Sequence, residues 1–189
     1  MGEKYDDNEQ KGIVALENIN KGELVSRCDL SICNYDYPIK EGDHCTRDEL
    51  LKLIEKYPLA KQYLTSYSVM IDDNCFWIPK YYKECKITEP CVYFNHSCDP
   101  NCAYSDDDLL SVSAIKDIHV NEELTLHYGT VDTEESLLLD LNCKCGSTNC
   151  SKILKFDWYK QGEWQNKFEQ YSTGYIKRKI KEYREKDNN

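Results

Sequence analysis

Three cysteines near the C-terminal end restrict the fold of this chain more than any other feature of its sequence. Cys143, Cys145 and Cys150 lie within eight residues, around one glycine. The chain has 11 cysteines, an odd number, and its first residues lack the apolar stretch of a secretory signal. We therefore expect a reducing, intracellular setting, in the nucleus or the cytoplasm, where clustered thiols are first of all metal ligands. Three thiolates leave tetrahedral zinc one ligand short, so a fourth thiolate must come from elsewhere in the chain.

The composition is that of a folded, acidic protein. Of the 189 residues, 40% are hydrophobic and 12% aromatic, which is enough for the core of one ordinary domain. The longest apolar runs are three or four residues, so we expect no association with a membrane. The net charge of −10 argues against direct binding to nucleic acid and favours a basic partner such as a lysine-rich peptide, although solubility alone would explain the same charge.

Two parts of the sequence predict helices. Thr46, followed three residues later by Glu49, forms a capping box, which predicts a helix over residues 47–56. Between residues 156 and 187, apolar and aromatic residues recur at steps of three and four, which predicts an amphipathic helix broken near Gly174. We expect this aromatic stripe to pack onto the domain. Its basic run, 177–181, is typical of a solvated helix face, although a nuclear address has the same composition.

The remaining pattern is that of short strands. Runs rich in β-branched and apolar residues predict strands at 13–16, 23–26, 67–71, 75–78, 109–115 and 124–128. The turn residues Asp72, Asp73 and Asn74 lie between two of these runs and predict a hairpin. No internal repeat or low-complexity tract is visible, so we expect a single domain with additions.

A polar segment, Asn-His-Ser-Cys-Asp-Pro-Asn at 95–101, carries the second concentration of reactive side chains. Its first three residues also fit a glycosylation site, which matters only in a secreted protein. His96 alone is typical of a hydrogen-bonded core histidine, and a catalytic pair of His96 with Cys98 is a further alternative. No Gly-x-Gly-x-x-Gly follows a predicted strand, which excludes a Rossmann cofactor site.

Taken in order, the segment 95–101, the run Glu-Leu-Thr-Leu-His-Tyr at 123–128 and the three-cysteine tail resemble a SET-domain protein-lysine methyltransferase with a post-SET zinc segment. Lys-Gly-Ile-Val-Ala at 11–15 is similar to the first glycine motif of that family. The resemblance covers residues 10 to about 155, and the stretch 157–176 resembles the helical extension of short stand-alone SET proteins. It implies a mainly β fold, with small sheets around a knot-like core and with added helices.

The resemblance also implies a division of the chain. We expect a flexible N-terminus at 1–9, a SET domain at 10–130, a post-SET zinc segment at 139–155 and a helical extension at 156–189. Within the SET domain we expect a helical insert near 46–65. The helices of the extension are expected near 157–187.

Roles for particular residues follow from the same resemblance. Cys98 would join Cys143, Cys145 and Cys150 in a closed zinc site. The backbone around Lys11 and Gly12 and the polar groups of Asn95 and His96 would hold S-adenosylmethionine. Tyr128 would contact the cofactor as the catalytic tyrosine, and Leu126 and Tyr93 would border the pocket for the substrate lysine. Gln10, Val92 and His127 stand where the family usually has Gly, Arg, and Asp or Asn.

The implied reaction is methyl transfer from S-adenosylmethionine to a lysine in a basic segment of a protein. Histone is the best-known target of the family, and we expect the chain to act as a monomer. Leu126 occupies a position where related enzymes often have Phe or Tyr, so we expect a roomier pocket that allows di- or trimethylation. The alternative function is a catalytically silent SET fold that serves as a zinc-stabilised protein-binding module.

Overall fold

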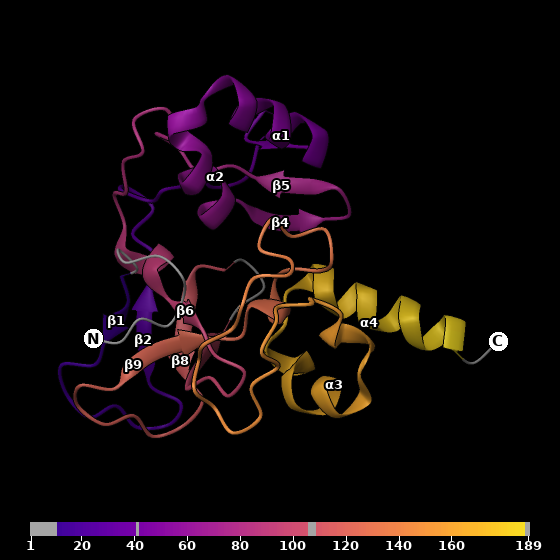
Figure 1. The fold of residues 1–189 in the computed structure, drawn as a ribbon. Coiled ribbons are helices and arrows are strands. Elements are labelled where there is room, and N and C mark those ends of the chain that lie inside the picture. The colour runs from indigo at the N-terminus through magenta and orange to yellow at the C-terminus, as the bar shows by residue number, and fades with distance from the viewer. Residues whose placement is uncertain (1–10, 41, 106–108, 188–189) are drawn as a thin grey trace.

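Small β-sheets make up the body of the fold, and helices are added at two places (Figure 1). The computed structural model describes residues 11–40, 42–105 and 109–187. The expected flexible segment 1–9 and Gln10 lie outside the described residues. The strands are β1 (Ile13–Val14), β2 (Leu24–Arg27), β3 (His44–Cys45), β4 (Val69–Asp72), β5 (Cys75–Trp77), β6 (Asn95–His96), β7 (Cys102–Tyr104), β8 (Ser111–Ala114) and β9 (Glu123–Leu126).

The α-helices are α1 (Arg47–Lys56), α2 (Lys61–Tyr67), α3 (Gly162–Phe168) and α4 (Gly174–Asp187). Single 3-10 turns are η1 (Pro58–Ala60), η2 (Pro90–Tyr93), η3 (Tyr128–Thr130), η4 (Trp158–Lys160) and η5 (Glu169–Tyr171). The expected fold class, mainly β with helical additions, is therefore confirmed.

Two three-stranded sheets form the body of the molecule. In the first, β9 lies between β1, to which it is antiparallel, and β6, to which it is parallel. The second sheet has the order β2–β8–β7. Parallel neighbours need a long crossover, and here the crossover is the segment 97–122, which contains β7 and β8. As a result, Asn95 pairs with Thr125 and His96 with Leu126, although these residues are distant in the sequence.

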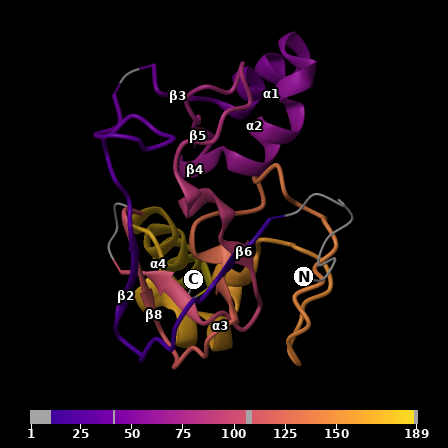
Figure 2. The same cartoon turned by 90° about the vertical axis from the view of Figure 1, so that its left-hand side faces the viewer.

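The insert between β2 and β6 carries the helices that the capping box predicted. The Thr46 hydroxyl accepts a hydrogen bond from the Glu49 N–H at 3.3 Å, and the Glu49 carboxylate accepts one from the Thr46 N–H at 2.8 Å. Helix α1 accordingly begins at Arg47 and ends at Lys56. The predicted hairpin is β4–β5, which joins β3 in a third sheet. Both views show this insert at one end of the molecule (Figures 1 and 2).

The C-terminal extension lies beside the body of the molecule, with α4 next to the β4–β5 hairpin of the insert (Figure 1). The predicted break is present, since α3 ends at Phe168 and α4 begins at Gly174. Ile176 and Ile180 of α4 are completely buried in the cluster that also contains Trp158. None of the helices in the described ranges has the length and apolar character that crossing a lipid bilayer requires.

Part of the basic run 177–181 contacts the insert. Arg178 forms ion pairs with Asp72 and Asp73 at the turn of the β4–β5 hairpin, and the Lys179 Nζ lies 2.8 Å from Asp73. Each of these exposed pairs contributes little by itself. Together they fix the orientation of α4 against the hairpin, so this side of the helix is not simply a solvated face.

Candidate functional site

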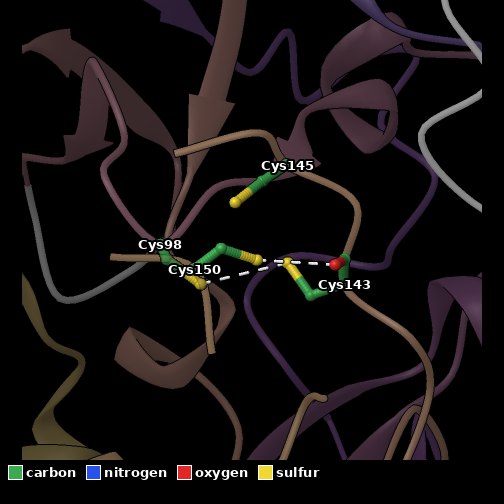
Figure 3. Close-up of side chains that lie close together, drawn as sticks. All are labelled: Cys98, Cys143, Cys145 and Cys150. Carbon is green, nitrogen blue, oxygen red and sulfur yellow. Dashed lines mark hydrogen bonds between the residues drawn. The ribbon is translucent and has the colours of Figure 1, made fainter. Parts of the chain in front are cut away.

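Four cysteines from two distant segments converge beside the first sheet (Figure 3). Cys98 follows β6, and Cys143, Cys145 and Cys150 belong to the irregular tail. Their Sγ atoms all lie within 4.8 Å of one another, and the Sγ atoms of Cys98 and Cys143 are 3.9 Å apart. Four sulfurs bound at 2.3 Å to one tetrahedral zinc would be about 3.8 Å apart. The arrangement fits the four-thiolate site that the resemblance implied.

Hydrogen bonds to these sulfur atoms favour the thiolate form that a metal requires. The Ser151 N–H donates to Cys98 Sγ at 3.4 Å, and the Lys152 N–H donates to Cys150 Sγ at 3.4 Å. The Cys143 thiol lowers the pKa of the Cys98 thiol. The same hydrogen bond between the two sulfur atoms raises the pKa of the Cys143 thiol, so it is the spacing of the four sulfur atoms that fits zinc.

His96 connects this cysteine cluster to Tyr128. The Tyr128 N–H donates to His96 Nδ1 at 3.1 Å, so in the neutral ring the proton resides on Nε2. His96 Nε2 lies 3.3 Å from Cys98 Sγ, and it donates its hydrogen to the sulfur. The imidazole is completely buried. It therefore links the position of Cys98 to the backbone of Tyr128 through two hydrogen bonds.

Tyr128 borders a cavity of about 130 Å³. Its hydroxyl donates to the Phe94 carbonyl oxygen at 3.1 Å, and burial raises the pKa of Tyr128 well above its ordinary value. The phenol therefore remains protonated at neutral pH. Leu126 lines the same cavity, and its role at a substrate pocket stays a prediction. The other aromatic members of the wall are Tyr35, Tyr67, Trp77, Phe94 and Tyr104.

Asp132 is a member of this wall that the sequence did not single out. Its side chain is 8% exposed, and burial raises the pKa of its carboxyl group to about 6. The residue opens the run Asp-Thr-Glu-Glu at 132–135, whose composition is that of an exposed loop. No local pattern in such a run distinguishes the one acid that is buried.

Lys11, Gly12 and Asn95 meet on the β1 side of the first sheet. Asn95 Nδ2 donates to the Lys11 carbonyl oxygen at 3.0 Å and to Glu123 Oε1 at 2.7 Å. A Cβ atom at Gly12 would lie 2.6 Å from Glu123 Oε1 and 2.9 Å from Asn95 Nδ2. A side chain at position 12 would therefore displace the Glu123 carboxylate or the Asn95 amide from this arrangement.

Tyr93 lies near this group and is not among the described residues that line the cavity. It ends η2, and its ring makes an edge contact with Tyr67, with centroids 6.4 Å apart. The Lys11 Nζ lies 5.6 Å from the centre of the Tyr93 ring. Tyr93 therefore adjoins the cavity wall through Tyr67, and its role at the substrate pocket stays a prediction.

The segments that meet at this site are those of one known domain. Residues 10–129 match the SET domain. This chain belongs to the SET-domain family. The match ends one residue after Tyr128, so the three-cysteine tail and the C-terminal extension follow the matched part of the SET domain.

Relatives of this SET-domain chain are methyltransferases by name. A histone-lysine N-methyltransferase, H3 lysine-4 specific, of Neurospora crassa is 29% identical over 148 residues, which cover 76% of this chain and 10% of the relative. Methyltransferase flvH of Aspergillus flavus is 38% identical over 64 residues, 33% of this chain and 35% of the relative. The methyltransferase domain of human SETMAR superposes with a TM-score of 0.44 at 21% identity, over 80% of this chain and 56% of that one. This chain thus spans about a tenth of the length of the Neurospora relative.

His127 shows how the extension supports this SET domain. It is 2% exposed, and its ring packs against the rings of Trp158 and Phe168, with centroids 4.6 and 4.8 Å away. Its two ring nitrogens face the N–H groups of Gly129 at 3.1 Å and of Trp164 at 3.2 Å, and a neutral imidazole accepts at only one of them. Burial lowers the pKa of His127, so the ring stays neutral. His127, which stands where the family usually has Asp or Asn, is therefore held in place by aromatic residues of the C-terminal extension.

Proposed function

We propose that this chain is a protein-lysine N-methyltransferase that uses S-adenosylmethionine. The observation that carries the proposal is the cavity beside Tyr128. Its wall is largely aromatic and apolar, which suits the alkyl chain of a lysine, and it adjoins the hydroxyl of a tyrosine that remains protonated. S-adenosylmethionine, when bound, supplies an electrophilic methyl group on a sulfonium.

The residues proposed to hold this cofactor offer the polar chemistry that it needs. The Lys11 carbonyl, the Asn95 amide and the Glu123 carboxylate converge at Gly12, where no side chain intervenes. Such a group of donors and acceptors suits a ligand with an amino-acid end and hydroxyl groups. His96, on the same sheet, would fix the backbone that leads to Tyr128.

Tyr128 would orient the amine. Its hydroxyl donates to the Phe94 carbonyl oxygen at 3.1 Å. The lone pairs of the hydroxyl oxygen are then available to accept a hydrogen bond from the amine. Alignment of this kind reduces the entropy lost in reaching the transition state. The four cysteines would hold one structural zinc ion, which attaches the tail to the segment 95–101.

The proposed substrate is a basic, lysine-containing segment of a protein. A net charge of −10 favours such a segment, and the names of the relatives make histone the first candidate and the nucleus the first location. Radiolabelled methyl transfer to a panel of histones and to whole-cell extract tests this proposal. Absence of both methyl transfer and S-adenosylmethionine binding would refute it and favour a silent binding module.

Tyr128→Phe is expected to slow methyl transfer at least about tenfold while the protein folds and binds cofactor. The substitution removes only the aligning hydroxyl and its hydrogen bond to Phe94, which is worth about 1 kcal/mol of stability. Single-turnover rates at saturating cofactor measure the effect. An unchanged rate would move the chemistry away from this residue.

Leu126→Tyr is expected to restrict the product to monomethyl-lysine. Leu126 is 4% exposed and lines the cavity, so a tyrosine there would occupy space that a methylated amine needs in order to turn. We expect the wild type to form di- or trimethyl-lysine. Mass spectrometry of the product decides, with Leu126→Met as the matched variant of similar volume. Monomethylation by all three proteins would show that position 126 does not control the pocket.

A further inference from the structure

The proposed reaction leaves one proton without an acceptor. A lysine side chain arrives as an ammonium group, which has no lone pair and must lose a proton before it attacks a methyl group. Tyr128 is protonated at neutral pH, so it cannot accept that proton. The inference below rests on the proposed function, since it concerns the group that accepts the proton.

Asp132 lines the same cavity as Tyr128. Its N–H donates to the Tyr128 carbonyl oxygen at 3.0 Å, so it lies one turn after Tyr128. Its Oδ1 accepts from the Met70 N–H at 3.3 Å, and its Oδ2 accepts from the Ser136 hydroxyl at 2.8 Å. Among the described residues that line the cavity, Asp132 is the one carboxylate, and none is Lys or Arg. The carboxylate is thus held in the wall without a cation beside it.

None of the other titratable side chains described in the wall is a lysine or an arginine. Burial raises the pKa values of Tyr35, Tyr67 and Cys28, and it raises the pKa of Cys91 to about 12. Burial lowers the pKa of His127, which remains an uncharged imidazole. Cys33 and Tyr104 complete the set. Among the described residues of the wall, none supplies a cation to the Asp132 carboxylate.

The remaining acids of the loop that carries Asp132 are engaged elsewhere. Glu134 forms an ion pair with Lys160, and the Glu135 carboxylate accepts from the Asn74 N–H at 2.7 Å. A buried carboxylate without a counter-charge is unfavourable, and a cation that enters the cavity would relieve it. Burial disfavours both ions, so it raises the pKa of the carboxyl group and lowers that of a bound ammonium. The two pKa values approach each other, which allows a proton to pass between them.

We propose that the Asp132 carboxylate pairs with the ammonium group of the substrate lysine and accepts its proton. In this step the N–H bond of the ammonium breaks and an O–H bond forms on Asp132, which leaves a neutral amine and a neutral carboxylic acid. The amine lone pair then forms the new N–C bond as the methyl group leaves the sulfonium, whose sulfur keeps the electron pair. Asp132 is therefore proposed as a catalytic residue.

The pH dependence of methyl transfer tests the assignment with D132N and S136A. In the wild type, kcat/KM should rise through an apparent pKa near 6, as the carboxylate forms, and stay level to about pH 9. D132N should be about a hundredfold slower at pH 7.5, and its rate should rise tenfold per pH unit with the free amine. The Ser136 hydrogen bond lowers the pKa of Asp132, so S136A should move the acid limb to higher pH and keep its shape.

Two further measurements do not depend on methyl transfer. Binding of n-butylammonium, a probe for the lysine side chain, should weaken below pH 6 in the wild type and be at least tenfold weaker in D132N at pH 7.5.

Burial raises the folded-state pKa of Asp132 above its unfolded value, so its ionisation reduces stability as pH rises from about 4 through 6. D132N removes that penalty, and Asn can keep contacts with Met70 and Ser136. Its Tm at pH 7.5 should therefore equal or exceed that of the wild type.

The outcomes separate this inference from the proposed function. A D132N protein with the wild-type pH profile and the wild-type affinity for n-butylammonium would overturn the role of Asp132, while methyl transfer stands. A lower Tm with an unchanged profile shape would assign Asp132 a purely structural role. A wild type that methylates no substrate would overturn the proposed function and the proton transfer with it. Binding of n-butylammonium would still test the ion pair between Asp132 and an ammonium group.

Discussion

Cys98→Ser is expected to release about one equivalent of zinc from the purified protein and to reduce methyl transfer at least about tenfold. Cys98 is the one member of the cluster that lies outside the tail, so its loss separates the tail from the segment 95–101. Three thiolates bind zinc weakly. The free energy of binding a structural zinc ion is also folding free energy, about 10–16 kcal/mol in zinc-finger peptides. Loss of a fraction of this energy suffices to disorder the tail.

The effect should also reach Tyr128. The Cys98 sulfur accepts the hydrogen of His96 Nε2, and His96 Nδ1 accepts the Tyr128 N–H. Without the metal the sulfur is no longer fixed, and the ring that orients this backbone loses its anchor. Metal analysis, proteolysis of the tail and activity should therefore change together.

Cys85→Ser is the matched control for this experiment. Cys85 is an exposed free thiol in the insert, outside the cluster. Its substitution should leave metal content, Tm and activity unchanged. A chelator should lower the Tm of the wild type and of Cys85→Ser, with little effect on Cys98→Ser. Full metal content in Cys98→Ser would contradict the four-thiolate site.

The sequence predicted best those elements whose signals are local. The capping box of Thr46 and Glu49 identified the start of α1, Pro58 marked its end, and the Asp72–Asn74 turn identified the β4–β5 hairpin. Strand ends were less well predicted. The expected strand 13–16 is reduced to Ile13–Val14, and the Ala15 N–H donates instead to the Glu122 carbonyl oxygen, which lies outside β9. Side-chain periodicity does not report where hydrogen bonding stops.

The candidate site was only partly visible in the sequence. The resemblance implied Cys98 as the fourth thiolate, and the structure brings its sulfur to 3.9 Å from that of Cys143. Spacing alone could not select it among 11 cysteines. Asp132 was not found, because its burial depends on how η3, β4 and the loop at Ser136 come together around it. The same is true of His127, whose partners Trp158 and Trp164 lie more than thirty residues later in the chain.

The helical extension therefore belongs to the site as well as to the core. Its periodic aromatic residues predicted packing onto the domain, and this is what they do. The structure shows what they cover: Trp158 contacts His96, which accepts the Tyr128 N–H, and His127, which precedes Tyr128 in the chain. The ring of Trp158 stacks on His96, with centroids 5.7 Å apart and planes at 24°. One tryptophan thus supports both histidines that surround the proposed catalytic tyrosine.

Gly129→Ala is expected to destabilise the protein by about 2–3 kcal/mol and to reduce methyl transfer. A Cβ atom at Gly129 would lie 2.5 Å from Cε3 of Trp158 and 3.1 Å from the His127 ring. Real contacts are not this short, so one ring must move. Trp158 is 7% exposed and packed on Phe156 and both histidines, so it has little space to move into. Overpacking of this kind costs about 1–3 kcal/mol, and this site lies at the upper end of that range.

Gly174→Ala is the matched control for Gly129→Ala. Gly174 begins α4, and a Cβ atom there would meet no atom within 4 Å. Alanine loses less conformational entropy in a helix, so this variant should be neutral or more stable by up to about 1 kcal/mol. Urea titrations give both free energies of unfolding, and single-turnover rates show whether Tyr128 is displaced. Equal stability of the two variants would contradict the close packing of Trp158 against Gly129. A Gly129→Ala protein that is destabilised and yet reacts at the wild-type rate would show that Trp158 supports the core without positioning Tyr128.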